Sequence, residues 1–188
     1  MKNGFTLIEM MVVLSIFTIM PGVVLANLPN FRERTALQLV AQKLSLTIRE
    51  AQVYGVGVKA SSATVLPSHG IHFYPTAGGS SNQKSYILFA DNDFDGKYTS
   101  ADKIVTPYDL TGTVEIQSIC TYESTECISR DAGLDIVFVR PNTEAKFVDS
   151  GGGVVSASYA NITLVSTRSN ETRTVQVWNT GQISVKPI

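Results

Sequence analysis

The acidic run after residue 90 is the stretch whose side chains could bind a metal ion. It reads Asp91-Asn92-Asp93-Phe94-Asp95-Gly96-Lys97-Tyr98-Thr99-Ser100-Ala101-Asp102. Acidic residues stand at positions 1, 3, 5 and 12 of this run and a glycine at position 6, as in the calcium loop of EF-hands. The pattern predicts one calcium ion held by these residues: Asp91, Asp93, Asp95, Lys97 through its backbone carbonyl, Thr99 directly or through water, and Asp102.

Two features of the run depart from an EF-hand. Position 12 is Asp102, whose side chain is shorter than the usual bidentate glutamate. Residues 86–89 before the run are Tyr-Ile-Leu-Phe, which predict a strand where an EF-hand has a helix. An Asp-rich surface turn without an ion is the alternative, because Asp and Gly favour turns. A bound ion would order this loop and would not catalyse a reaction.

Glu9 is the other residue whose position calls for a chemical explanation, because it lies in an apolar segment. Residues 5–26 contain no other charge and are long enough to cross a bilayer as a helix, which takes roughly 20 residues. An ionised carboxylate there costs about 3 kcal/mol even on lenient scales, so its presence predicts a function. A secretory signal peptide is the alternative for this segment. Glu9 within the apolar core, and a helical pattern that continues after Ala26, argue against it.

The segment after residue 29 predicts a second kind of helix. Apolar residues recur there every three or four positions, which is typical of an amphipathic helix, and Gly55 and Gly57 are expected to end it. The apolar face comprises Leu37, Val40, Leu44, Ile48 and Ala51. Pro21 and Pro29 are expected to kink or locally unwind the helix. We therefore expect one arm whose first half suits lipid or a protein bundle and whose second half packs on a sheet.

The start of this arm resembles a known processing signal. Gly4 followed by Phe5-Thr6-Leu7-Ile8-Glu9 is similar to the class III prepilin signal of type IV pilins and type II secretion pseudopilins. The resemblance implies that prepilin peptidase cleaves after Gly4, that the new terminal residue Phe5 is N-methylated, and that Glu9 serves in assembly. It implies the following organisation: leader peptide 1–4, transmembrane and assembly helix 5–29, amphipathic helix 30–57 and β-rich globular domain 58–188.

The same resemblance implies a location and a set of partners. The protein would be held in the bacterial inner membrane by a single span, with its C-terminal domain outside the cytoplasm. It would then join other pilin or pseudopilin subunits in a pilus or pseudopilus. Lys2 in the short leader agrees with this orientation, because basic residues favour the cytoplasmic side.

Beyond residue 57, short β-rich runs alternate with turn residues, so the predicted fold class is α+β: a long N-terminal helix packed on an antiparallel sheet or on two sheets, as in pilins. The expected strands cover residues 70–74, 85–90, 113–119, 134–139, 145–148, 161–165, 173–178 and 182–185. Gly181 is expected at a positive-φ position of a hairpin turn. The order of the C-terminal strands is similar to that of minor pilins and pseudopilins of the GspH/FimT group.

The two cysteines, Cys120 and Cys127, lie on either side of a short polar segment. An even count at close spacing in an exported chain favours a disulfide, which would contribute about 2.5 kcal/mol for a ring of about 8 residues. Two free thiols or half of a metal site are the alternatives. No His or Cys lies nearby in the sequence to complete four ligands.

Composition argues against nucleic-acid binding and against catalysis. The formal net charge is -1, and Arg168, Arg173 and Lys186 are scattered, so the sequence has no basic patch for phosphate. DNA binding for uptake, as in some proteins of the FimT type, is the alternative function. His69 and His72 have no acidic pattern beside them, and no nucleophile elbow or phosphate loop is present. We therefore expect a structural, non-enzymatic minor pilin or pseudopilin.

Overall fold

The computed structural model describes residues 4–57, 66–76 and 81–186, without the side chains of residues 24–27, 29–30 and 81–82. Residues 1–3 of the predicted leader and residues 58–65 at the start of the predicted globular domain lie outside the described part. Within it, one long α-helix and a short 3-10 helix, η1 (Ser81–Lys84), accompany eleven strands in two antiparallel sheets. The predicted α+β class, with a long N-terminal helix packed on antiparallel sheets, is confirmed.

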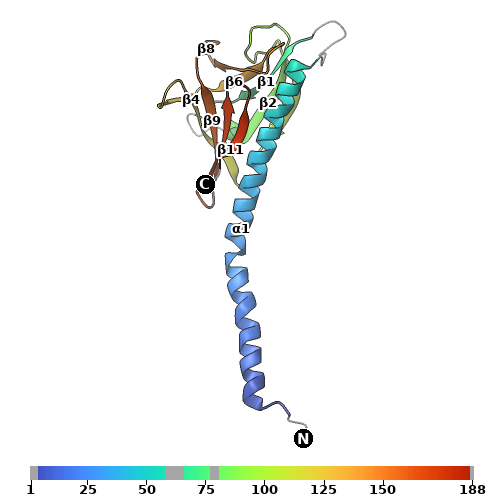
Figure 1. Ribbon diagram of the computed structural model, residues 1–188, viewed down its shortest axis with the longest axis vertical. Helices are drawn as coiled ribbons and strands as arrows, with labels where there is room; N and C mark the ends of the chain where they lie inside the picture. The colour runs from blue at the N-terminus through green and yellow to red at the C-terminus, as the bar shows by residue number, and fades with distance from the viewer. Residues whose placement is uncertain (1–3, 58–65, 77–80, 187–188) are drawn as a thin grey trace.

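Helix α1 (Leu7–Val56) forms the arm and one side of the globular domain (Figure 1). Thr6 is its N-cap, and the helix ends at Gly57, whose N–H donates to the carbonyl of Val53 at 2.8 Å. The backbone stays helical through Pro21 and Pro29, so the prolines do not unwind it. Figure 1 shows only a shallow change of direction near the middle of the helix.

The second half of α1 is docked, and the first half is not. The predicted apolar face is buried at all five positions, and Ala41 joins it: Leu37, Val40, Ala41, Leu44, Ile48 and Ala51. In the first half, by contrast, apolar side chains such as Leu7 and Phe17 are 79% and 77% exposed. Among the described residues, no helical stretch has the length and hydropathy of a membrane span. The transmembrane role of residues 5–29 therefore stays a prediction.

The two sheets are antiparallel throughout. Sheet A has the order β3-β2-β1-β6-β7-β8, and sheet B has the order β11-β10-β9-β4-β5. The strands of sheet A are β1 (Ser68–Phe73), β2 (Ser85–Asp91), β3 (Lys103–Asp109), β6 (Leu134–Phe138), β7 (Ala145–Asp149) and β8 (Val154–Val155). Those of sheet B are β4 (Val114–Tyr122), β5 (Cys127–Ser129), β9 (Tyr159–Ser166), β10 (Thr172–Trp178) and β11 (Ile183–Lys186).

Eight of these strands match the predicted runs, and three were missed. β3 contains Pro107, which argues against a strand in sequence-based reasoning. Its place at the edge of sheet A explains the exception, because an edge strand has one side that needs no backbone donor. β5 and β8 have only 3 and 2 residues, too few to show a pattern.

One apolar core joins α1 to both sheets. Alternate residues of the central strands enter it, for example Ile71 and Phe73 from β1 and Ile162 and Leu164 from β9. The other face of sheet A carries a smaller cluster of Ile87, Phe89 and Val137, packed against Tyr74, Tyr98 and Val139. The central strands of sheet A are therefore buried on both faces.

Gln52 near the end of α1 joins the helix to both sheets. Its Nε2 donates to the carbonyl of Thr143, in the turn between β6 and β7, at 2.9 Å and to that of Gly181, in the turn between β10 and β11, at 3.0 Å. Gly181 has φ +85°, as predicted for this turn. A Cβ on Gly181 would lie 2.1 Å from the Thr143 carbonyl oxygen and 2.5 Å from Gln52 Nε2. This approach requires glycine.

Glu33 attaches the docked half of α1 to sheet B at the end nearest the arm. Its carboxylate accepts hydrogen bonds from the hydroxyls of Thr113 and Ser166 and lies 3.5 Å from Arg168 Nη1. These two hydroxyl donors, with the charge of Arg168, lower the pKa of Glu33 below its ordinary value near 4.5. The helix is thus tied to sheet B by a carboxylate that is stabilised in its ionised form.

We expect Gly181→Ala to destabilise the protein much more than Gly112→Ala. Both glycines have positive φ, which costs an alanine about 1 kcal/mol, but a Cβ on Gly112 would meet no described atom within 4 Å. The overlap at Gly181 should add about 2 kcal/mol or more. Guanidinium unfolding of the full chain in detergent, followed by circular dichroism, measures the difference. Equal losses would show that the turn is not packed as described.

Glu33→Gln should change the dependence of stability on pH. Because the folded-state pKa is lowered, the stabilisation by Glu33 is present above about pH 4.5 and is lost as pH falls through the folded-state value. The variant should therefore melt at a lower temperature than the wild type at pH 6, and the gap should narrow towards pH 3. Glu144→Gln removes an exposed carboxylate and serves as the control. A gap that stays constant with pH contradicts the role given to the Glu33 carboxylate.

Candidate functional site

The predicted cleavage point lies in the short non-helical segment before α1. Gly4, Phe5 and Thr6 are exposed and precede the first helical residue, Leu7. A Cβ on Gly4 would meet no described atom within 4 Å. The peptide bond after Gly4 is therefore accessible to a peptidase.

Glu9 takes part in a capping box at the start of α1. Its backbone N–H donates to Thr6 Oγ1 at 3.3 Å, and its carboxylate Oε2 accepts from the backbone N–H of Thr6 at 3.4 Å. The spacing Thr-x-x-Glu is the sequence signature of this motif. The box satisfies two backbone donors, but it brings no positive charge to the carboxylate.

The surface around Glu9 is apolar and uncovered. Within residues 5–23, every large hydrophobic side chain is at least half exposed: Phe5, Leu7, Ile8, Met10, Met11, Val12, Val13, Leu14, Ile16, Phe17, Ile19, Met20 and Val23. A contiguous apolar surface of this kind marks an interaction with protein or lipid. The helix therefore offers a binding surface along its first half.

The acidic run lies in the loop between β2 and β3, at the end of the globular domain away from the arm (Figure 1). Asp91, the last residue of β2, is 1% exposed. Its Oδ2 accepts from Ser68 Oγ at 2.8 Å and from the backbone N–H of Gly96 at 3.2 Å. Its Oδ1 is also buried, and no residue of the described chain donates a hydrogen bond to it.

Burial raises the pKa of Asp91 above its ordinary value, and the nearby carboxylates of Asp102 and Asp93 raise it further. The hydrogen bonds from Ser68 and Gly96 act in the opposite direction. The ionised form of Asp91 is thus disfavoured at this position when no cation is bound.

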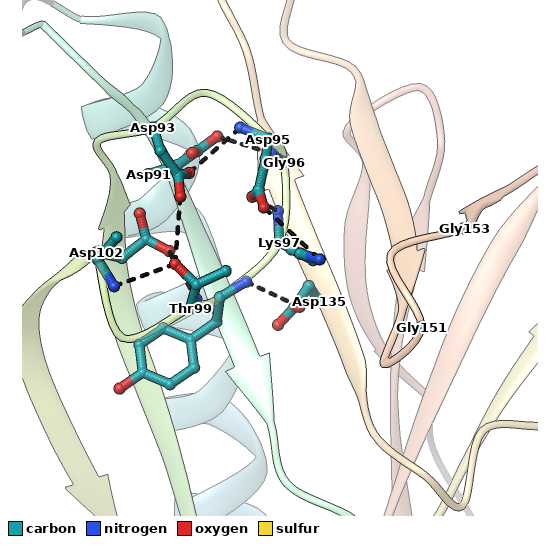
Figure 2. Close-up of polar contacts among 12 residues, drawn as sticks. Asp91, Asp93, Asp95, Gly96, Lys97, Thr99, Asp102, Asp135, Gly151 and Gly153 are labelled. Carbon is teal, nitrogen blue, oxygen red and sulfur yellow. Dashed lines mark hydrogen bonds and ion pairs between the residues drawn. The ribbon is translucent and has the colours of Figure 1, made fainter.

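Three of the predicted ligands come together. One carboxylate oxygen from each of Asp91, Asp93 and Asp95 lies within 4.8 Å of the others, and Figure 2 shows the three side chains on one turn of the loop. Gly96 has φ +79°, the left-handed conformation that the predicted sharp turn requires. Hard oxygen ligands in this arrangement suit a divalent cation such as calcium.

The side chains of the other three predicted ligands make contacts within the loop. Asp102 accepts from the backbone N–H of Asn92 at 2.9 Å and from that of Thr99 at 2.7 Å, so its carboxylate joins the two halves of the loop. The Thr99 hydroxyl lies 3.3 Å from Asp93 Oδ2 and 3.2 Å from Asp102 Oδ2, between the two carboxylates. Lys97 Nζ lies 3.8 Å from Asp95 Oδ2.

Sequence reasoning missed the residues that hold this loop on sheet A. Asp135 on β6 is 3% exposed, and its Oδ1 lies 2.6 Å from His72 Nδ1 on β1. Its Oδ2 accepts from the backbone N–H of Tyr98 at 3.0 Å (Figure 2). A charged residue inside the apolar run 134–138 was the available signal, but its partner His72 is distant in sequence.

The ring of Tyr98 fixes the second half of the loop by packing. It lies 4.7 Å from the His72 ring and 5.4 Å from the Phe89 ring, measured between centroids. Both partners are on the face of sheet A that points away from α1, where Phe89 belongs to the smaller apolar cluster. The loop is therefore attached to the sheet at Asp91 and again at Tyr98.

Cys120 and Cys127 form a disulfide between β4 and β5, as predicted. The two strands also pair directly, with Cys120 opposite Ser129 and Tyr122 opposite Cys127. The bond closes the hairpin at the outer edge of sheet B. Free thiols and a cysteine metal site are excluded for this pair.

Comparison with known proteins bears on the N-terminal segment alone. No curated protein and no solved structure shows significant similarity to the chain. Residues 1–20 match the family model described as the prokaryotic N-terminal methylation motif. The match covers the predicted cleavage point, the predicted methylated residue and Glu9. Together with the long helix packed on antiparallel sheets, it supports a type IV pilin-like protein.

Proposed function

We propose that the protein is a structural subunit, a minor pilin or pseudopilin of the GspH/FimT kind, in a type IV pilus or a type II secretion pseudopilus. The observation that carries this proposal is the methylation motif in residues 1–20. The motif opens a helix whose first half is apolar and exposed and whose second half is built into a globular domain. Such a subunit is cleaved after Gly4 by prepilin peptidase and methylated at Phe5.

The exposed half of α1 gives the subunit two successive environments. Before assembly, its apolar side chains lie in the inner membrane, where they need no protein partner. In the filament, the same side chains pack against the helices of neighbouring subunits. The domain formed by sheets A and B then faces outward, because it is attached to the other half of the same helix.

Glu9 sets the axial position of each subunit. A carboxylate in apolar surroundings is costly, and the capping box with Thr6 supplies hydrogen bonds but no counter-charge. The N-terminal amine of Phe5 in a neighbouring subunit supplies that charge. Only one axial offset between two helices brings the amine to the carboxylate, so the ion pair fixes the register.

The contacts of the basic residues favour this structural role over nucleic-acid binding. Arg168, considered above for phosphate, lies 3.5 Å from the Glu33 carboxylate, and Arg173 Nε donates to Gln38 Oε1 at 2.9 Å. Both arginines therefore help to hold α1 on sheet B. Lys186 lies over the ring of Tyr159, with Nζ 5.8 Å from its centroid.

Substitutions at Glu9 should separate its charge from its capping role. Glu9→Gln keeps a side chain that can complete the capping box but carries no charge. We expect Glu9→Gln and Glu9→Ala to lose filament incorporation about equally, while membrane insertion and cleavage persist. Thr6→Ala breaks the cap and leaves the charge, so it should incorporate far better. Incorporation is measured by the amount of the subunit in sheared filaments relative to the membrane fraction.

The Gln variant decides between the two roles. If Glu9→Gln incorporates like the wild type while Glu9→Ala fails, the carboxylate acts as a helix cap and the ion-pair proposal is wrong. Normal incorporation of both variants would remove Glu9 from assembly altogether.

Cleavage after Gly4 predicts a defined N-terminus. The mature protein should begin at Phe5 and carry one additional methyl group, as measured by mass spectrometry of the protein and of its N-terminal peptide. Gly4→Val should leave the leader attached, because a branched side chain replaces the exposed glycine at the cleaved bond. An N-terminus after Ala26 would instead identify residues 1–26 as a secretory signal peptide.

A further inference from the structure

We propose that the β2–β3 loop binds one calcium ion through the carboxylates of Asp91, Asp93 and Asp95, with Asp102 as a positioning residue that closes the loop. The proposal does not depend on filament assembly. It rests on a buried oxygen atom without a donor, on the charge of the loop and on the way in which the sheet holds the loop.

The buried oxygen is Oδ1 of Asp91. Asp91 is 1% exposed, and Ser68 and Gly96 both donate to Oδ2, which leaves Oδ1 without a hydrogen bond from the described chain. Buried polar atoms are nearly always satisfied, and a carboxylate oxygen without a partner is costly. A cation at Oδ1 would satisfy this atom.

The negative charge of the loop also favours a bound cation. Three carboxylates within 4.8 Å of one another repel. Lys97 is the basic residue within this loop, and its Nζ is 3.8 Å from Asp95, beyond hydrogen-bonding distance. The same Nζ would lie 3.2 Å from a Cβ placed on Gly152, so the side chain extends towards the β7–β8 turn. It therefore offsets part of the charge at Asp95, and no residue of the described chain, Lys97 included, donates a hydrogen bond to Asp91 Oδ1.

The site is held in shape by contacts outside the ligand set. Asp102 accepts from the backbone N–H groups of Asn92 and Thr99, which are separated by most of the loop. Tyr98 is fixed by its hydrogen bond to Asp135 and by packing on the sheet. A loop ordered in this way loses less conformational entropy when an ion binds.

The ligand chemistry selects calcium. The cluster offers oxygen atoms only, which suits calcium or magnesium over zinc. Calcium accepts six to eight oxygen ligands in irregular geometry, and here loop carbonyls and water would add to the three carboxylates. Magnesium requires near-octahedral geometry and releases its water reluctantly. Loops of this kind in extracellular modules bind calcium with a Kd of about 10⁻⁴ to 10⁻³ M.

Calorimetric titration of the full chain in detergent tests the site, after removal of divalent ions by a chelator. We expect one calcium ion per chain with a Kd of about 10⁻⁴ to 10⁻³ M. In 10 mM calcium chloride the melting temperature should rise by roughly 3 to 10 °C. Magnesium chloride at the same concentration should produce a much smaller rise.

Variants of the loop locate the ion. Asp93→Asn and Asp95→Asn should each weaken calcium binding about tenfold or more, since each removes a charged ligand. Asp109→Asn makes the same change at an exposed position of β3 and should bind like the wild type. Lys97→Gln should bind calcium at least as tightly as the wild type, because a competing cation is removed.

Asp91→Asn tests the buried ligand. The amide keeps the shape of the side chain but removes the charged group whose Oδ1 has no donor in the described chain, so the variant should bind calcium at least tenfold more weakly. Its melting temperature should not rise in 10 mM calcium chloride, while its circular dichroism without calcium should match that of the wild type. The absence of both binding heat and a rise in melting temperature for the wild type would overturn the proposal. Equal weakening by Asp109→Asn and Asp95→Asn would also overturn it, because binding would then reflect general charge.

Discussion

The burial of one stripe of α1 against two sheets is the interaction on which the rest of the structure depends. Leu44, Ile48 and Ala51 are fully buried, and the core around them takes side chains from both sheets. Removal of this apolar surface from water is the main driving force that joins the sheets to the helix. The helix therefore fixes the positions of the two sheets relative to each other. The helix in turn leaves its first half free for other partners.

The acidic loop depends on this packing indirectly, because it is attached to sheet A and sheet A packs on α1. The inner face of sheet A packs on α1, while its outer face carries His72, Phe89 and Asp135, which hold the loop through Tyr98. β1 pairs with both β2 and β6, so Ser68 stands opposite Asp91 and His72 stands opposite Asp135. The strand register thus brings together polar residues that are far apart in the sequence.

Sequence reasoning succeeded where a pattern is local. The apolar face of α1, the Gly181 turn and the disulfide follow from periodicity, turn chemistry and cysteine spacing, and each is confirmed. The clustering of Asp91, Asp93 and Asp95 follows from their alternate spacing. The Asp135–His72 pair was missed because it depends on strand register. The strand β3 was missed because it contains Pro107, which argues against a strand in sequence. A strand accommodates proline at the edge of a sheet, and the sequence does not show that β3 is an edge strand.

The two polar ties at the ends of the docked half of α1 have a mechanical consequence. Glu33 holds the helix to sheet B at the end nearest the arm, and Gln52 holds it to turns of both sheets at the far end. A pull along the arm runs along the helix axis, so it loads these ties and the core between them together, in shear. Contacts loaded in parallel share the force, whereas contacts that are peeled break one at a time. The docked half of α1 is therefore placed to transmit tension from the arm to the globular domain without being pulled out of it.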